Sequence, residues 1–490
     1  MKIDKNKLDI KSISDKWDTS GGVSIYHKGE CIYRDFSGYA NRETKETITE
    51  HSTYLFSGAT HFLLSLSLLL LTDMKKIKLT DTIDKYIPEY IHAHKIKIKH
   101  LLQGESGIRD YFYGNIMPKL KDDEEHNLLD DKTRMTKEKK MSTYGYTFEE
   151  VLQIIGKEEL EFEPGSEKGE YSKTNEIFCK EIIERVSGMK LLDFEIKYIF
   201  EPLNMLHTKR GRSVNTNNYC TFRDNELLQT TVDETANDLF TTSFADIEKL
   251  LLALYEGKLI SNKTWEKAIN FNGVNIGLGF SSVNGTICSD DFNFLGYYAA
   301  LYFNEEADLC YMQLTNSEIK LESVNGSWMH FRKELRNEID TFFTYPKNTR
   351  IVPYNKKNWY DALNLQISKE QYEFVCDAKQ TIAYAFAHQK DHKLFVGMEG
   401  DRPVGLMVLQ SNKKTQKFNF SILLVDKRYQ GRGFGKIMLK WGVEYFKQQG
   451  AKELTIGVNR FNISAQNLYK SVGFKEDLVY EEGMQLKLEL

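Results

Sequence analysis

One stretch near the end of the chain constrains the fold more than any other. An apolar run from Phe418 to Val425 is followed by the glycine-rich loop QGRGFG, residues 430–435, and by apolar residues at helical spacing from about Lys436. A glycine-rich turn that opens a helix presents unpaired N–H groups and the positive end of the helix dipole. The stretch therefore predicts an anion site of the kind that holds a pyrophosphate, with glycines that allow close backbone approach.

The region around this loop has the pattern of a separate domain. From about residue 350 the order is strand, helices, strands, loop, helix, strand and helix, which is typical of a compact α/β domain. The Pro-containing segment TYPKNTR precedes it, so we predict domains over residues 1–345 and 350–490. Residues 350–490 carry 22 Lys/Arg and 15 Asp/Glu. That balance suits a polyanionic ligand, although a solvated basic surface explains it equally well.

The loop has the spacing Gln-x-x-Gly-x-Gly, which differs from the dinucleotide-binding fingerprint. A strand and helix follow in AKELTIGVNRFNISAQNLYKSVGF, and the hairpin KLFVGMEGDRPVGLMVLQ precedes it. With these segments, residues 350–490 resemble the GNAT family of N-acetyltransferases, and within it the bacterial polyamine acetyltransferases. The resemblance implies acetyl-CoA as the cofactor. It also implies transfer of acetyl to a primary amine of a small molecule, such as a polyamine, an amino sugar or an amino-containing antibiotic.

The resemblance also implies roles for single residues. The backbone of the loop would hold the pyrophosphate, through Gln430, Gly431, Arg432, Gly433, Phe434 and Gly435. Val425 would bind the pantetheine arm through its backbone, and Asn462 would lie near the cofactor. Tyr469 would protonate the leaving thiolate, a task that suits a phenol with a pKa near 10. The structural alternative for Tyr469 is an aromatic residue packed in the core.

No general base for the amine can be assigned from the sequence. Three carboxylates are candidates on the substrate side, Asp426, Glu481 and Glu482, and each fits better as a surface charge.

The first part of the chain has a different character. The motif FSGATHF, residues 56–62, opens the apolar run Phe62 to Leu71, which predicts a buried helix. This run is about half the ~20 residues of a membrane span. With KHLLQGESGIRDY, FEPGSEKGEYSKTNEIF and IFEPLNM, residues 15–340 resemble the β-lactamase-like and penicillin-binding serine hydrolases. The fold class implied for the whole chain is α+β followed by α/β: an antiparallel sheet flanked by helices, then a GNAT fold.

Hydrolysis in that family needs a serine nucleophile, a lysine one helical turn later, a tyrosine motif and a third motif ending in glycine. Here Gly58 takes the serine position and His61 the lysine position. Tyr171 is kept, but Lys173 replaces the usual asparagine. The stretch CSDDFNFLG before the third-motif glycine, Gly296, contains neither Lys-Thr-Gly nor His-x-Gly. We therefore predict no acyl-enzyme and a non-catalytic domain.

Ser57 is the one candidate replacement nucleophile beside His61. If both residues share a helix, a shift by one residue turns the hydroxyl by roughly 100° away from the cleft. What remains is a cleft with His61, Tyr171 and Lys173, which either binds an anionic or peptide-like ligand and serves substrate binding or regulation, or is kept for packing alone. The segment 119–143 is highly charged and poor in apolar residues, which predicts a mobile insertion.

Composition excludes several other classes. A net charge of −4 does not suggest a nucleic-acid binder, and six scattered cysteines without Cys-x-x-Cys argue against a zinc site and for free thiols. The first 20 residues lack an apolar segment, so we expect a cytoplasmic protein without a membrane partner. The expected partner is a small-molecule amine, and a homodimer stays open. The competing interpretations are a serine hydrolase or esterase with displaced catalytic residues, and a ligand sensor without enzymatic activity.

Overall fold

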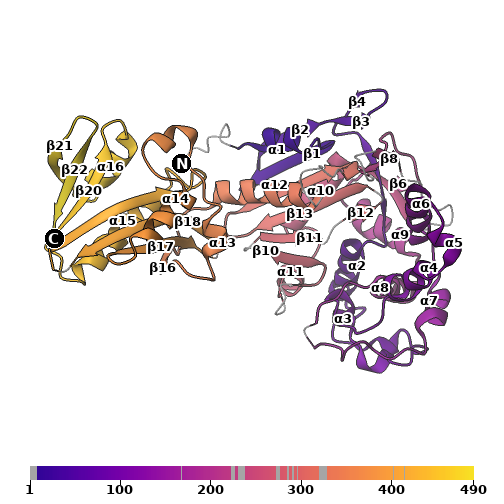
Figure 1. Cartoon of the computed structure of the whole chain (residues 1–490). Coiled ribbons are helices and arrows are strands. Elements are labelled where there is room, and N and C mark those ends of the chain that lie inside the picture. The colour runs from indigo at the N-terminus through magenta and orange to yellow at the C-terminus, as the bar shows by residue number, and fades with distance from the viewer. Residues whose placement is uncertain are drawn as a thin grey trace. The chain divides into compact units, whose positions relative to one another are not determined.

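The computed structural model describes residues 8–490 except 167, 222–226, 230–237, 272–275, 284–285, 290–291, 295, 319–327, 401 and 413. The chain divides into two compact units, Met1–Arg336 and Asn337–Leu490. Figure 1 colours the chain by residue number, from indigo at the N-terminus to yellow at the C-terminus. The division falls inside helix α12 (Trp328–Phe343). The expected bounds of 345 and 350 lie a few residues beyond it.

The first unit is built on an antiparallel sheet in the order β10-β11-β13-β14-β1-β2, with β12 beside β13. The expected antiparallel sheet is confirmed. Its strands are β1 (Gly21–His27), β2 (Glu30–Ser37), β10 (Phe280–Val283), β11 (Thr286–Ser289), β12 (Phe292–Phe294), β13 (Tyr297–Asn304) and β14 (Leu309–Thr315). The β1–β2 turn lies at Lys28 and Gly29. Both residues have positive φ, 54° and 76°, as a two-residue type I′ turn requires.

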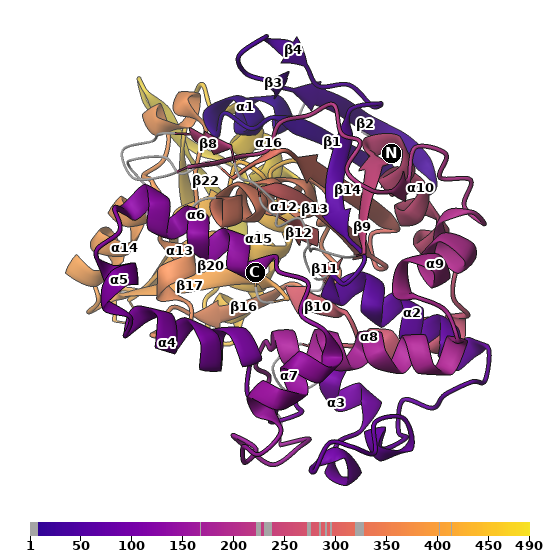
Figure 2. The same cartoon turned by 90° about the vertical axis from the view of Figure 1, so that its right-hand side faces the viewer.

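Helix α2 (His61–Asp73) lies at the centre of the helical part of this unit, and every residue from Phe62 to Leu71 is buried. It packs against α8 (Lys173–Ser187), which also contacts α3 (Ile98–Leu102) and α7 (Phe148–Ile155) (Figure 2). The predicted buried helix is confirmed. Among the described residues, no helix has the length and apolar character to cross a membrane.

Smaller elements complete the first unit. The remaining helices are α1 (Ile10–Lys16), α4 (Met117–Lys121), α5 (Glu124–Asn127), α6 (Asp131–Ser142), α9 (Leu191–Glu195), α10 (Phe244–Tyr255) and α11 (Asn262–Ala268). The remaining strands are β3 (Tyr39–Asn41), β4 (Glu46–Thr47), β5 (Thr53–Ser57), β6 (Lys209–Arg210), β7 (Tyr219–Thr221), β8 (Leu227–Gln229), β9 (Leu239–Ser243) and β15 (Ser317–Glu318). The charged insertion 119–143 is helical. Asp123 and Asp130 cap α5 and α6, and none of the α6 residues is buried.

The second unit is a seven-stranded sheet in the order β16-β17-β18-β19-β20-β22-β21. The strands are β16 (Arg350–Pro353), β17 (His392–Glu399), β18 (Arg402–Asn412), β19 (Lys417–Val425), β20 (Glu453–Asn459), β21 (Lys475–Val479) and β22 (Gly483–Glu489). The helices are α13 (Trp359–Ala362), α14 (Ala378–Ala387), α15 (Phe434–Lys447) and α16 (Ile463–Lys470). Helix α15 begins two residues earlier than expected, because Gly433 occupies its N-cap.

One strand pair in this sheet opens along its length. Strands β19 and β20 are parallel and pair only through Asn419 with Thr455 and Phe420 with Ile456. Both pairs lie near the start of the strands, whereas β19 pairs with β18 as far as Val425. Residues 421–425 of β19 therefore have no ladder partner on the β20 side within the described chain. The two strands diverge toward the end of β19 that leads into the glycine-rich loop.

Candidate functional site

The conformation of the loop after β19 depends on two of its glycines. Gly431 and Gly433 have φ values of 75° and 98°, in the left-handed region that other residues enter only with strain. A Cβ on Gly431 would meet no atom within 4 Å, so this glycine satisfies a backbone requirement and not a packing one. Gly435 differs, because its Cβ would lie 3.2 Å from Leu468 Cδ2. That glycine allows α16 to approach the first turn of α15.

Several backbone N–H groups of the loop are unpaired. The carbonyl of Gly433 accepts the N–H groups of Lys436 and Ile437 at 3.1 and 3.2 Å. In the part of the chain that the structure describes, the N–H groups of residues 431–435 have no acceptor. They lie at the N-terminus of the 14-residue helix α15, where the helix dipole is positive. The arrangement matches the anion site that the sequence predicts.

Side chains of the loop hold it in place. Gln430 Nε2 donates to the Val425 carbonyl at 2.8 Å and to Gln371 Oε1 at 2.9 Å. Arg432 donates to the carbonyl of Thr344 at 3.0 Å and to that of Thr341, near the C-terminus of α12. The Arg432 guanidinium also lies over the rings of three aromatic residues, Phe342, Tyr345 and Tyr429. These contacts leave the backbone of the loop, and not the Arg432 side chain, to meet a ligand.

Asp426 is not the surface charge that we expected. It is fully buried, and its carboxylate accepts hydrogen bonds from the backbone of Gln366 at 2.7 Å and of Arg428 at 2.9 Å. The Arg428 guanidinium pairs with the same carboxylate at 2.8 and 2.9 Å. The sequence could not show this, because the alternation of β19 ends at Val425 and gives no signal for the next residue. Asp426 therefore positions the segment that leads into the loop.

Tyr469 lies on α16, next to the Leu468 that packs on Gly435. It is 7% exposed and packs in the core with Phe474. Its hydroxyl has no hydrogen-bond partner among the described residues, and burial raises the pKa of the phenol to about 12. The group therefore stays protonated at neutral pH.

The other residues expected around this site have simpler surroundings. Asn462 caps α16, because its side chain accepts the N–H of Ala465 at 3.1 Å. Glu481 and Glu482 are exposed in the turn between β21 and β22. Within this unit, the structure therefore brings the loop, the open edge of β19 and the helix that carries Tyr469 to one end of the sheet.

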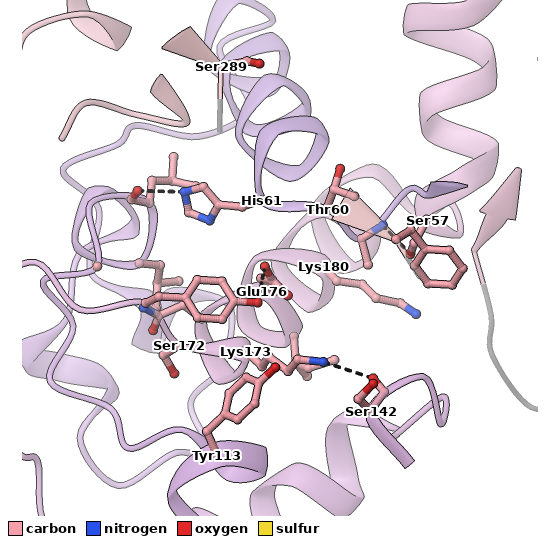
Figure 3. Close-up of a pocket in the computed structure, with 18 of the residues that line it drawn as sticks. Ser57, Thr60, His61, Tyr113, Ser142, Ser172, Lys173, Glu176, Lys180 and Ser289 are labelled. Carbon is pink, nitrogen blue, oxygen red and sulfur yellow. Dashed lines mark hydrogen bonds between the residues drawn. The ribbon is translucent and has the colours of Figure 1, made fainter. Parts of the chain in front are cut away.

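The packing around Gly58, which we expect to take the serine position, leaves no room for a side chain. Gly58 donates its N–H to the Asp238 carbonyl at 2.8 Å, and a Cβ on it would lie 2.2 Å from Glu195 Oε2. Ser57 and His61 do not share a helix, because Ser57 ends β5 and α2 begins only at His61. A turn at residues 58–60 separates them, and Figure 3 shows them on opposite sides of Thr60.

The remaining motif residues are engaged within the cleft. His61 Nε2 is 3.0 Å from the Leu102 carbonyl, and Lys173 Nζ donates to the Ser142 carbonyl at 3.0 Å (Figure 3). The lysine thus contacts the C-terminus of α6 and also lies 5.0 Å from the Phe112 ring centroid. The third-motif stretch lies partly outside the described residues. Within it, Ser289 accepts the N–H of Leu301 at 3.0 Å.

Sequence reasoning missed one titratable group in this cleft. The Tyr171 hydroxyl donates to Glu176 Oε1 at 3.1 Å, and burial raises the pKa of Glu176 to about 7, against the opposing charge of Lys173. Burial among the cleft walls likewise holds the pKa of Tyr171 well above its usual value, although solvent reaches its ring. The Tyr-Ser-Lys motif lies only a few residues from Glu176, but its spacing does not say which face of α8 the carboxylate takes.

The beta-lactamase family matches residues 11–329, which is well over half of the chain. The chain belongs to the beta-lactamase family. The acetyltransferase (GNAT) family matches residues 358–474, so the second unit carries a GNAT domain. Both resemblances inferred from the motifs are confirmed, and the GNAT domain assigns acyl transfer in general to the second unit.

The curated relatives include an acetyltransferase and a hydrolase. Human N-acetyltransferase 8B is 25% identical over 121 residues, 25% of this chain and 52% of that protein. Teichoic acid D-alanine hydrolase of Staphylococcus aureus is 23% identical over 256 residues, 50% of this chain and 56% of that protein. The chain thus spans about half the length of these curated relatives.

Solved structures show the beta-lactamase-like fold. A D-amino acid amidase from Ochrobactrum anthropi aligns with a TM-score of 0.53 and 19% identity, over 69% of this chain and 97% of its own. FmtA from Staphylococcus aureus aligns with a TM-score of 0.51 and 19% identity, over 71% of this chain and 91% of its own. At these identities the likeness concerns the fold alone.

Proposed function

We propose that the chain is an acetyl-CoA-dependent N-acetyltransferase that acts on a primary amine of a small molecule such as a polyamine, an amino sugar or an amino-containing antibiotic. One observation carries the proposal. The unpaired N–H groups of residues 431–435 lie at the positive end of α15, directly after β19, and β20 diverges from β19 toward that end. The unpaired N–H groups suit a pyrophosphate, and the open edge of β19 suits the amides of an extended pantetheine arm.

Acetyl-CoA would supply the acetyl group as a thioester. The backbone of residues 431–435 would hold the negative charge of the pyrophosphate, and the open edge of β19 over residues 421–425 would bind the amides of the arm. In the transfer, the nitrogen of the amine would bond to the acetyl carbon as the carbon–sulfur bond breaks. Tyr469 gives its hydroxyl proton to the departing sulfur. Because burial raises the pKa of the phenol to about 12, Tyr469 stays protonated at neutral pH and has a proton to give as the sulfur leaves.

The amine must also lose a proton, and the exposed carboxylates of Glu481 and Glu482 are the candidates that stay in this proposal. Asp426 is assigned to positioning, because its carboxylate is buried and paired with Arg428.

The experiment that tests the proposal measures release of the CoA thiol from acetyl-CoA by the full chain with polyamines, amino sugars and aminoglycosides as acceptors. We expect amine-dependent thiol release together with an acetylated amine of the expected mass. Acetyl-CoA that neither binds nor turns over with any of these amines would overturn the proposal.

We further propose that the beta-lactamase-like unit does not hydrolyse substrates. Gly58 has no hydroxyl, and Glu195 fills the space in which a side chain at this position would begin. Ser57 does not replace it, because its Oγ accepts the N–H of Ala59 at 3.2 Å and the turn at residues 58–60 separates it from His61. The esterase and sensor interpretations therefore have less support than acyl transfer by the second unit.

A further inference from the structure

The first unit contains a cavity of about 1000 Å³ that the acetyltransferase proposal does not use. It lies over the N-terminal ends of α2 and α8, and Figure 3 shows His61, Tyr113, Lys173 and Glu176 around it. Five tyrosines line it, Tyr111, Tyr113, Tyr144, Tyr146 and Tyr171. Rings and hydroxyls of this kind suit a small organic molecule with an aromatic or otherwise flat group.

The charges that line the cavity are unbalanced. Six side chains are cationic, Lys139, Lys173, Lys180, Arg332, Lys333 and Arg336, and three are acidic, Glu170, Glu176 and Asp238. Asp238 already pairs with Lys180. Glu176, which accepts the Tyr171 hydroxyl, has its pKa raised to about 7 by desolvation and so contributes less than a full negative charge at pH 7. The described lining is therefore net positive, whichever state Glu176 adopts.

Several of these cations have no carboxylate to neutralise them. Arg336 Nη1 lies 3.9 Å from the Cys288 sulfur and forms no ion pair within the described residues. Lys333 and Lys139 form none there either, and they come from different elements, α12 and α6. Lys173 Nζ points to the end of α6 beside them. Cations from α6, α8 and α12 thus surround one hollow, and the lack of acidic partners leaves their charge for a ligand.

We propose that this cleft binds a small organic anion, one that carries a carboxylate or a phosphate monoester, and that it is not the site of the amine substrate. Arg336, Lys333 and Lys139 contribute charge-assisted hydrogen bonds, and the tyrosines cover the organic part. A cationic polyamine would meet the same positive charges and be repelled. The inference concerns the first unit alone and does not depend on acetyl transfer by the second.

The test measures binding to the full chain by calorimetry with three probes, phenyl phosphate, benzoate and benzylamine. All three carry one benzene ring, and they differ in the charged group, which is a phosphate, a carboxylate or an ammonium. We expect phenyl phosphate or benzoate to bind and benzylamine not to bind. Whichever of the two anions binds with the higher affinity shows whether the cleft prefers a phosphate or a carboxylate. Arg336→Met should weaken anion binding by roughly tenfold to hundredfold, because it removes a charge-assisted hydrogen bond.

Two further variants keep the test decisive. Lys139→Met removes a charge from α6, so it reports on the cleft even if Arg336→Met fails to fold. Lys76→Met removes an exposed charge that does not line the cavity and should leave binding unchanged. The proposal is overturned if neither anion binds, if benzylamine binds more tightly, or if anion binding survives both cleft variants. The last result would assign the anion to another part of the chain, such as the loop at residues 431–435.

Discussion

The carboxyl group of Glu195 occupies the place where a side chain on residue 58 would begin, with Oε2 only 2.2 Å from the Cβ that Gly58 lacks. Glu195 is fully buried, and both of its oxygens are without hydrogen-bond partners in the described structure. Gly58 and Glu195 are thus parts of one packing arrangement. A side chain introduced at residue 58 would meet the Glu195 carboxyl.

Gly58→Ser should therefore destabilise the first unit and fail to create a hydrolase. Overpacking of this kind costs about 1–3 kcal/mol, measured as the free energy of unfolding in urea. Glu195→Ala opens the space, so the double variant Gly58→Ser/Glu195→Ala should be more stable than the sum of the two single changes predicts. Additive effects would show that the two side chains do not compete for this space.

The buried Glu195 also predicts a pH dependence of stability. Burial, with the nearby charge of Asp238, holds the pKa of this carboxyl well above its usual value. The folded chain therefore keeps a proton that the unfolded chain releases above about pH 4.3, so folding stability falls as pH rises from there to the folded pKa. Glu195→Gln removes the titration. Its stability relative to the parent should rise between pH 4 and pH 8, by about 1.4 kcal/mol for each unit of pKa shift.

Thermal unfolding of both proteins across that pH range checks this prediction. Glu201→Gln, at an exposed position six residues further on, serves as the matched control and should show no such trend. An equal pH profile for parent and Glu195→Gln would mean that Glu195 is not buried as a neutral acid.

Covalent serine-hydrolase probes should leave the chain unmodified. Gly58 offers no hydroxyl, and Ser57 is separated from His61 by the turn that precedes α2. We expect no adduct with a fluorophosphonate or a penicillin, as measured by intact mass and peptide mapping beside an active serine hydrolase. An adduct on Ser57, or on any other serine of the first unit, would revive the hydrolase interpretation.

Gly433→Glu should abolish acetyl-CoA binding. The new carboxylate would enter the space in front of the unpaired N–H groups of residues 431–435 and repel the pyrophosphate. A ligand at ~100-fold its Kd stabilises a protein by roughly 2.7 kcal/mol, so thermal shift gives the readout. Gly450→Glu is the matched control, because Gly450 also has positive φ, 83°, and open space around its Cβ. Stabilisation of the Gly433 variant to the parental extent would remove the loop from the cofactor site.

Tyr469→Phe tests the proposed proton donor. The hydroxyl has no hydrogen-bond partner in the described structure, so its removal should leave packing and acetyl-CoA binding nearly unchanged. General acid catalysis contributes ~10²–10⁴-fold, so kcat and kcat/KM should fall together by about that range. Tyr445→Phe, which removes a hydroxyl beside the same core, should keep its activity. A Tyr469 variant with parental kcat on a confirmed amine would assign Tyr469 to packing alone.

The sequence alone was enough to predict what depends on short-range pattern. The buried run Phe62 to Leu71 and the strand, loop and helix around Gly433 follow from periodicity and glycine chemistry between residues close in the chain. The same local motifs carried both family resemblances. The absence of a hydroxyl at Gly58 is likewise a property of one position and needs no coordinates.

Tertiary structure decided what fills the space around those positions. Glu195 is far from Gly58 in the chain, and only the fold brings its carboxyl against the glycine. From the sequence we expected Asp426 to be a surface charge. It is buried, and Arg428 and the backbone of Gln366 satisfy its carboxylate. Burial sets the pKa of Glu176 as well. Desolvation and packing depend on atoms from many distant segments, and no local pattern of residues records them.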